Sequence, residues 1–191
     1  AQNTFVPDDN FEQALIDLGY DSGMLNDSVP TLNIKPVTLL NVDGKNIGDL
    51  TGIKDFTSLT ALNCCNNKLT VLNTSNNLSL LELLCFNNQI NTIDLSTNTN
   101  LTKLICYNNN LTEIDLSTAP ALITLYCSNN QLSNLDLSKN ISLKYVNCSN
   151  NQLHSLNLKN GNNNKMTGGN YWETSIDSRN NPDLFCIQVD N

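Results

Sequence analysis

The sequence contains few of the residues on which enzymes and nucleic-acid-binding proteins depend. Its 191 residues include one histidine and one tryptophan, and 10 lysines and arginines stand against 18 aspartates and glutamates, a formal net charge of −8. Because the basic residues are few and not clustered, we expect no nucleic-acid partner. No stretch approaches the roughly 18 apolar residues that a membrane-spanning helix needs, so we expect no membrane insertion.

Catalytic patterns are also missing from the sequence. The single histidine, His154, has no partner at a catalytic spacing, and no nucleophile elbow, phosphate-binding loop or zinc motif occurs. Glu82 and Glu113 fall on opposite halves of their repeats, so they cannot flank one glycosidic bond. We therefore predict that the chain is not an enzyme and that it needs no cofactor and no metal.

What the sequence does contain is a repeat with a period of 21 residues. Each repeat opens on the pattern L-x-x-(L/V)-x-C-x-N-N, and five consecutive repeats begin at Leu59, Leu80, Leu101, Leu122 and Leu143. A fixed period of this length is typical of a solenoid, in which every coil buries its apolar edge against its neighbours. We predict a leucine-rich repeat solenoid, a right-handed β-rich superhelix with a parallel concave sheet, short extended convex segments and an N-terminal helical cap.

Cysteine and asparagine occupy fixed positions in the repeat. Strand alternation turns Leu62 and Cys64 inward, and Ala61, Asn63 and Cys65 outward. Inward cysteines are expected to be buried free thiols, with disulfides and metal binding as alternatives. The asparagine that follows each by three residues is expected to satisfy backbone groups at the turn. The predicted structural ladder consists of Cys64, Cys85, Cys106, Cys127 and Cys148 with Asn67, Asn88, Asn109, Asn130 and Asn151.

The two ends differ from the middle of the chain. Residues 1–36 predict an N-terminal cap with one amphipathic helix, and residues 37–163 predict a 22-residue first coil followed by five 21-residue coils. Residues 164–191 predict a degenerate coil and a C-terminal capping strand. Two cysteines lie outside the ladder, Cys65 and Cys186. A disulfide between them would need to span several coils, so either of them could instead be a free surface thiol.

The nested unit L-x-x-L-x-C-x-x-N-x-L-x-x-L-D-L-S-x-N-x-x resembles the short bacterial leucine-rich repeats of the IRREKO type, which are frequent in secreted proteins of Bacteroidetes. The opening from Val6 to Tyr20 looks like the N-terminal cap of such proteins. Related internalin-like proteins bind protein or glycan partners, often through the concave sheet, and the resemblance implies the same here. It implies a secreted or cell-surface location, and the start at Ala1 is compatible with removal of a signal peptide.

The outward positions of the central strands carry apolar side chains, and we predict that they form the binding surface. The predicted site consists of Glu82, Leu84, Phe86, Lys103, Ile105, Tyr107, Tyr126 and Tyr145. The alternative is that these side chains only stabilise the sheet by cross-strand packing. A self-associating adhesive scaffold is a second functional hypothesis, although we expect a monomer. Ice or cation binding along the row of Asp94, Asp115 and Asp136 is a remote third.

Overall fold

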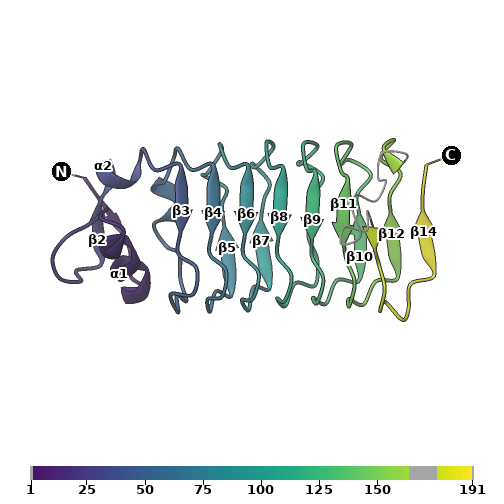
Figure 1. Cartoon of the computed structure of the whole chain (residues 1–191), viewed down its shortest axis with the longest axis horizontal. Coiled ribbons are helices and arrows are strands. Elements are labelled where there is room, and N and C mark those ends of the chain that lie inside the picture. Colours follow the sequence, from purple (N-terminus) through teal and green to yellow (C-terminus); the bar gives the residue numbers. More distant parts are fainter. Residues whose placement is uncertain (1, 164–175, 191) are drawn as a thin grey trace.

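The computed structural model describes residues 2–163 and 176–190. The predicted degenerate coil therefore lies in part outside the described residues. The chain forms an elongated stack of coils with its two ends at opposite extremes (Figure 1). The predicted leucine-rich repeat solenoid with a parallel sheet is confirmed.

One side of the stack is a seven-stranded parallel sheet, to which each coil contributes one short strand. In spatial order its strands are β3 (Leu39–Asn41), β4 (Ala61–Asn63), β6 (Glu82–Leu84), β8 (Lys103–Ile105), β9 (Thr124–Tyr126), β11 (Tyr145–Asn147) and β13 (Ile176–Asp177). This is the sheet that the sequence predicts to be concave. Its outward residues are the candidate binding positions.

The other side of the stack is strand-like but discontinuous. A two-stranded sheet pairs β5 (Val71–Asn73) with β7 (Thr92–Asp94), and a three-stranded sheet joins β10 (Asn134–Asp136), β12 (Ser155–Asn157) and β14 (Cys186–Gln188). Residues 113–115, which lie between the two sheets, form no strand. The first coil has a single 3-10 turn, η1 (Ile53–Asp55), in place of a strand.

The coil in which residues 113–115 form no strand also lacks a side-chain amide that its neighbours have. Asn98 donates from Nδ2 to the Asn77 carbonyl at 3.0 Å, and Asn140 donates to the Ala119 carbonyl at 2.8 Å. Ala119 occupies the equivalent position in the coil between them, and its side chain cannot donate. The second sheet is therefore interrupted in the same coil that loses its coil-to-coil amide bond.

The N-terminal cap is more elaborate than the one predicted helix. An antiparallel pair, β1 (Asn3–Phe5) with β2 (Ser28–Pro30), precedes and follows α1 (Asp9–Asp17), and a one-turn helix α2 (Thr31–Ile34) ends the cap. Helix α2 is an element that the sequence reasoning missed. It is only 4 residues long, too short for a helical periodicity to be visible.

Two carboxylates attach this cap to itself and to the first coil. Asp8 caps α1 by accepting from the Phe11 amide at 2.9 Å, and its second oxygen accepts from the amides of Gly48 at 2.8 Å and Asp49 at 3.0 Å. Glu12 is fully buried, and it accepts from the backbone amides at 26 and 27. Backbone donors thus satisfy the buried carboxylate.

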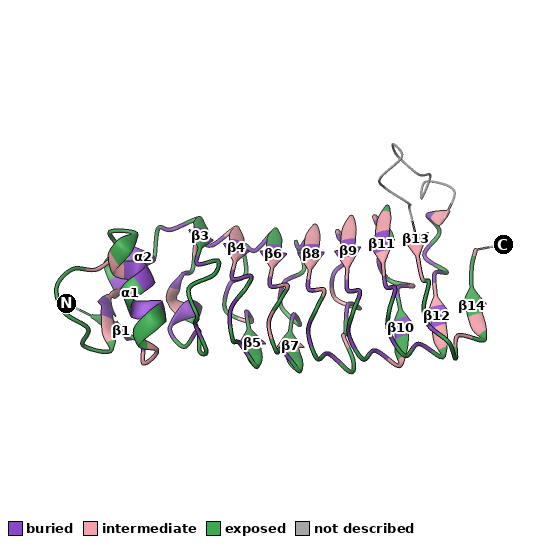
Figure 2. Ribbon diagram, turned by 60° about the horizontal axis from the view of Figure 1, so that its bottom comes forward, coloured by how far each residue is buried: buried purple, intermediate pink, exposed green. Residues whose placement is uncertain are grey.

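The interior is a column of apolar side chains between the two sides of the stack. Buried residues recur from coil to coil along the ribbon (Figure 2). Leu83 and Cys85 are fully buried, as are their equivalents one coil on, Leu104 and Cys106. All seven cysteines are free thiols. Between coils, Asn109 donates to the carbonyls of Cys85 at 3.0 Å and Cys106 at 3.1 Å and accepts from the Ile90 amide at 2.9 Å. Each ladder asparagine thus ties its own turn to the preceding coil.

The C-terminal strand extends the array instead of covering it. Ile187 of β14 lies beside Leu156 of β12 in register, yet Ile187 is 52% exposed whereas Leu156 is buried. Phe185 is 82% exposed and Val189 is 50% exposed. A strand lies where the sequence predicts the C-terminal capping strand, and its inward side chains face solvent because no further coil of the described residues packs on them. Its role as a cap stays a prediction.

Candidate binding surface on the seven-stranded sheet

The outward side chains of the seven-stranded sheet fall into three rows that run across the coils. The first row contains Leu39, Ala61, Glu82, Lys103, Thr124 and Tyr145. The second row contains Asn41, Asn63, Leu84, Ile105, Tyr126, Asn147 and Asp177. The third row contains Cys65, Phe86, Tyr107 and Ser128, whose backbones follow the same ladder.

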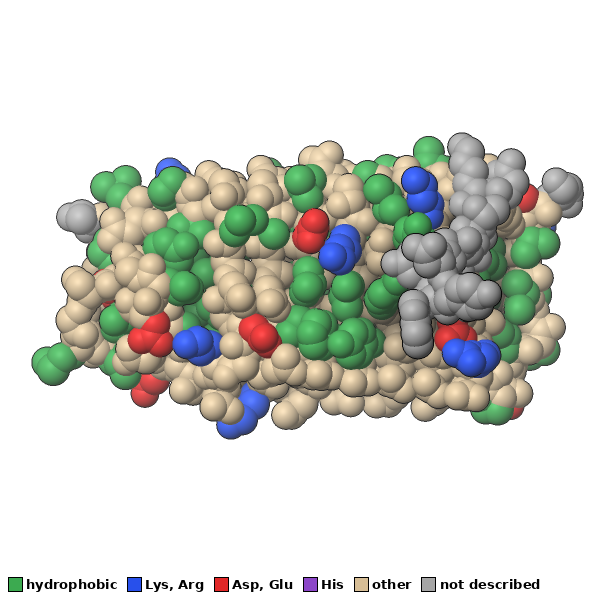
Figure 3. All heavy atoms as spheres, viewed as in Figure 1, with side chains coloured by type: hydrophobic (Ala, Val, Ile, Leu, Met, Phe, Trp, Pro, Cys, Tyr) green, Lys and Arg blue, Asp and Glu red, His purple; other side chains and the backbone are tan. Residues whose placement is uncertain are grey.

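This register changes the predicted outline of the site. Tyr126 continues the row of Leu84 and Ile105, whereas Tyr145 lies in the row of Glu82 and Lys103. The structure therefore brings together a compact central patch of Leu84, Phe86, Ile105, Tyr107 and Tyr126, and Tyr145 lies one strand beyond it, on a different row. Hydrophobic side chains gather in the middle of this face, beside one acidic and one basic side chain (Figure 3).

The two rings of the third row stack on each other. The centroids of Phe86 and Tyr107 are 4.6 Å apart and their planes are inclined by 9°. Such pairs add about 0.5–1.5 kcal/mol beyond the area that they bury. Both rings are half-buried, and this burial raises the pKa of the Tyr107 hydroxyl above its usual value. The hydroxyl therefore stays protonated and can donate a hydrogen bond.

An ion pair borders the patch on the first row. Lys103 Nζ lies 3.7 Å from a Glu82 carboxylate oxygen, and the two side chains are 39% and 48% exposed. An exposed pair of this length contributes little to stability. Both charges therefore stay accessible at the edge of the patch.

Cys65 is a free thiol but not a surface one. It belongs to the outward third row, yet it is fully buried, and this burial raises the pKa of its thiol to about 12. Ser128 in the same row is buried as well. Cys186, by contrast, is partly exposed on β14 at the far end of the array.

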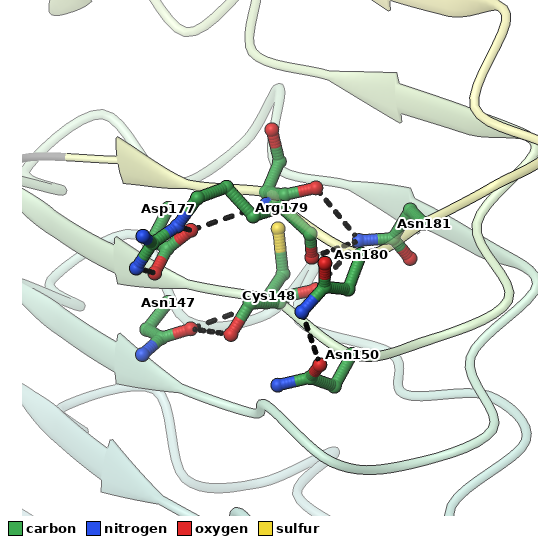
Figure 4. A network of polar contacts seen from close by, with 9 residues as sticks. Asn147, Cys148, Asn150, Asp177, Arg179, Asn180 and Asn181 are labelled. Atoms are coloured by element: carbon green, nitrogen blue, oxygen red, sulfur yellow. Dashed lines mark hydrogen bonds and ion pairs between the residues drawn. The ribbon is translucent and has the colours of Figure 1, made fainter.

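In the second row, Leu84 and Ile105 lack the side-chain acceptor that row members outside the patch use in a turn hydrogen bond. Outside the patch, Asn41, Asn63, Asn147 and Asp177 each accept a hydrogen bond from the amide two residues later, at 3.1–3.2 Å. Figure 4 shows the last two of these turns, at Asn147 and at Asp177. Leu84 and Ile105 occupy the same position and have no acceptor atom. The patch thus replaces a stabilising turn residue with apolar side chains.

The row of Asp94, Asp115 and Asp136 on the other side of the stack has the same turn function. Each accepts from the amide of the serine two residues later, at 2.9–3.0 Å. Hydrogen bonds from Ser96 lower the pKa of Asp94, and bonds from Ser117 lower that of Asp115. These bonds account for the row without a cation, and cation binding there stays a prediction.

A row of exposed amides runs alongside the aromatic pair. The side chain of Asn66 donates to Asp43, that of Asn87 to Asn66 and that of Asn108 to Asn87, each at 2.7 Å. These asparagines have φ of 54°, a left-handed conformation that asparagine tolerates better than most residues. The row gives the patch a polar border.

A hollow next to the patch escaped the sequence reasoning. It has a volume of about 260 Å³ and lies over β3, β4 and β6, where Ala61 stands between Leu39 and Glu82 in the first row. The small side chain of Ala61 leaves the space, and Leu84 of the patch forms part of its lining. Comparing residues 21 or 22 positions apart would have revealed this gap, because Ala61 is the smallest member of its row.

The fold resembles solved leucine-rich repeat proteins. An internalin (inlF) of Listeria monocytogenes matches with a TM-score of 0.69 at 27% sequence identity, over 81% of this chain and 50% of that chain. The functional domain of InlJ from Listeria monocytogenes, described as including a cysteine ladder, matches with a TM-score of 0.50 at 21% identity, over 100% of this chain and 62% of that one. A leucine-rich repeat protein of Leptospira interrogans matches with a TM-score of 0.58 at 20% identity, over 85% and 40%.

No protein-family model and no curated protein matches the chain. The structural matches show the class, a leucine-rich repeat solenoid with an internalin-like fold. They support a binding module in general. The narrower short-repeat family and a Bacteroidetes origin stay predictions, as does the absence of enzymatic activity. Within the described residues, no helix is long and apolar enough to cross a bilayer.

Proposed function

We propose that the chain is a secreted or cell-surface binding module that recognises a protein or glycan partner through the central patch of its seven-stranded sheet. The observation that carries this proposal is the substitution in the second row. Neighbouring coils keep an Asn or Asp that accepts a turn hydrogen bond, and the patch gives up that acceptor for Leu84 and Ile105. Aliphatic side chains at a partly exposed position, where other coils have a hydrogen-bond acceptor, favour recognition over stability.

The composition of the patch also supports recognition. Aromatic side chains dominate the energetics of many interfaces, and Phe86, Tyr107 and Tyr126 lie within two adjacent rows. The Glu82 and Lys103 charges at the edge provide orientation without a large cost of desolvation. A stacked ring pair is already ordered before a partner arrives, which reduces the entropy lost on binding.

The proposal is tested with a triple variant, Phe86→Ser, Tyr107→Ser and Tyr126→Ser. Wild-type and variant proteins are applied to a glycan array and to a pull-down of surface proteins, and circular dichroism checks the fold. We expect the triple variant to lose the ligands that the wild type captures, because it removes the three aromatic side chains.

A matched control places three serines on exposed apolar positions outside the patch, at Val71, Leu78 and Ile141. This control should bind as the wild type does. A folded patch variant that still captures the same ligands would refute the proposal. A wild type that forms a dimer by light scattering, with a monomeric patch variant, would favour the self-associating scaffold instead.

A further inference from the structure

We propose that the hollow beside Ala61 receives one aliphatic side chain of a polypeptide partner, and that Glu82 pairs with a basic group next to that side chain. This inference rests on the proposed function and narrows it, because it commits to a protein partner. Its elements are the shape of the hollow, the chemistry of its lining and the single charge at its edge.

The shape of the hollow follows from the register of the first row. Parallel strands are about 4.8 Å apart, so Leu39 and Glu82 lie roughly 10 Å apart on either side of Ala61. Leu39 is 66% exposed and forms a raised edge. A cavity of about 150 Å³ is enough for benzene. The hollow, at about 260 Å³, therefore has room for a leucine or isoleucine side chain.

The lining of the hollow favours an apolar group. Leu39, Ala61 and Leu84 contribute aliphatic surface. Two asparagines also line it, but the side-chain oxygen of Asn41 accepts from the Asp43 amide at 3.1 Å, and that of Asn63 accepts from the Cys65 amide at 3.2 Å. Their acceptor atoms are already engaged in turns, so the Glu82 carboxylate is the main free acceptor that the hollow offers to the hydroxyl groups of a sugar.

Charge complementarity identifies the second feature of the partner. Glu82 is the one ionisable residue that lines the hollow, in a chain whose net charge is −8. Its carboxylate is about half exposed, and the 3.7 Å contact with Lys103 is longer than a hydrogen bond. The carboxylate therefore has room for a second cation. A lysine or arginine beside the inserted aliphatic side chain meets this requirement.

The aromatic pair argues for a protein over a glycan. Sugars stack on ring faces, and the stacking of Phe86 on Tyr107, with centroids 4.6 Å apart, covers one face of each ring. The aliphatic side chains of Leu84 and Ile105 lie beside the pair in the adjacent row. Such a surface is typical of the apolar centre of a protein interface.

The test uses a displayed library of random peptides, selected on the intact wild-type chain. We expect the enriched peptides to carry Leu, Ile, Val or Met within two residues of Lys or Arg. The variant Ala61→Leu fills the hollow, and the row already holds a leucine at Leu39. It should weaken the enriched peptides at least 10-fold, whereas Ala61→Ser should leave their affinity within 3-fold of the wild type.

The charge is tested separately with Glu82→Gln. This variant should weaken the same peptides about 5-fold to 10-fold at low salt, and the difference should shrink at 1 M salt because screening weakens an exposed pair. Folding of every variant is checked by circular dichroism. Ala61→Met provides a second way to fill the hollow if Ala61→Leu does not fold.

The outcomes separate this inference from the proposed function. Peptides that lack the aliphatic and basic pair, no enrichment at all, or unchanged affinity for a folded Ala61→Leu variant would each overturn the inference. If the triple variant at Phe86, Tyr107 and Tyr126 no longer binds the enriched peptides but Ala61→Leu binds them normally, the patch is the binding site and the hollow is not used. If they bind the triple variant normally, the proposed function itself fails.

Discussion

Each inward cysteine serves the solenoid as a small buried group whose thiol is protected from ionisation. Cys85, Cys106 and Cys127 are fully buried, and this burial raises the pKa of each thiol well above its usual range. A thiol fills less space than leucine and can still lie close to the backbone of the next coil, as in the contact of 3.6 Å between Cys64 Sγ and the Leu84 carbonyl. Stacked thiols thus tolerate the tight coil spacing.

These thiols predict that stability falls in alkaline solution. The pKa of the Cys148 thiol rises to about 12 in the folded chain, whereas an unfolded thiol ionises near pH 8.5. Between these values the folded state binds more protons than the unfolded state, so the free energy of unfolding decreases as pH rises. The decrease is about 1.4 kcal/mol per pH unit for each buried thiol. Urea unfolding between pH 8 and pH 11 measures it.

The variant Cys106→Ala should reduce the decrease of the free energy of unfolding with pH by the contribution of one thiol, about 1.4 kcal/mol per pH unit. The control, Leu104→Ala, removes a neighbouring buried side chain that does not titrate. It should lower stability by about the same amount at every pH, at a cost of roughly 2–5 kcal/mol. A slope that is unchanged in Cys106→Ala would contradict the assignment of the pH dependence to buried thiols.

At the scale of the coil, the sequence predicted the burial pattern that repeats within each strand. It missed features that depend on side chains of the neighbouring coils. Strand alternation was enough to place Leu83 and Cys85 inward, because both faces of a strand are set by a period of two. The burial of Cys65 at an outward position was missed, and so was the hollow, which depends on the small side chain of Ala61 between Leu39 and Glu82 of the neighbouring coils. Alternation within one strand describes neither of them.

The turn of each coil contains two adjacent asparagines with different functions. Asn109 is buried and makes four hydrogen bonds to backbone groups, whereas Asn108 is exposed and has φ of 54°. Asn109→Ala should therefore cost about 3 kcal/mol, since four backbone groups lose their partner. Asn108→Gly should cost less than about 1 kcal/mol, because glycine adopts a positive φ without strain. Urea unfolding of the two variants measures the difference.

A similar loss of stability in both variants would show that the exposed amide row matters as much as the buried ladder. A small effect of Asn109→Ala would mean that water replaces the amide at the turn. We expect the free energy of unfolding of Asn109→Ala to be well below that of Asn108→Gly, and that of Asn108→Gly to be close to the wild-type value.

At the scale of the molecule, the two ends of the described part of the solenoid differ in burial. Val6, Phe11 and Leu15 of the N-terminal cap are fully buried, whereas Ile187 and Val189 at the last described strand are half exposed. In a stack of coils each repeat contacts only its neighbours, so stability depends on position in the array. The exposure of Ile187 and Val189 was not visible in the sequence, because both match the inward pattern whether or not anything covers them.

This asymmetry predicts a gradient of amide hydrogen exchange. Amides of β12 and β14 should exchange faster than those of β4 and β6, because the terminal coil opens without breaking a second interface. Exchange followed by mass spectrometry or NMR measures the gradient. Phe11→Ala, which weakens the cap, should speed exchange in β3 and β4 and leave β12 unchanged. Equal protection at both ends of the wild type would contradict the prediction.

The interruption at residues 113–115 has a mechanical consequence. The coil that carries Ile105 and Tyr107 has no strand at residues 113–115 on its back, and its Ala119 lacks the amide of its neighbours. Side-chain hydrogen bonds still join this coil to the next one, since Asn140 donates to the Leu116 and Ala119 carbonyls, but strand pairing is absent there. We therefore expect the array to bend more easily behind the central patch than at coils that are paired on both sides.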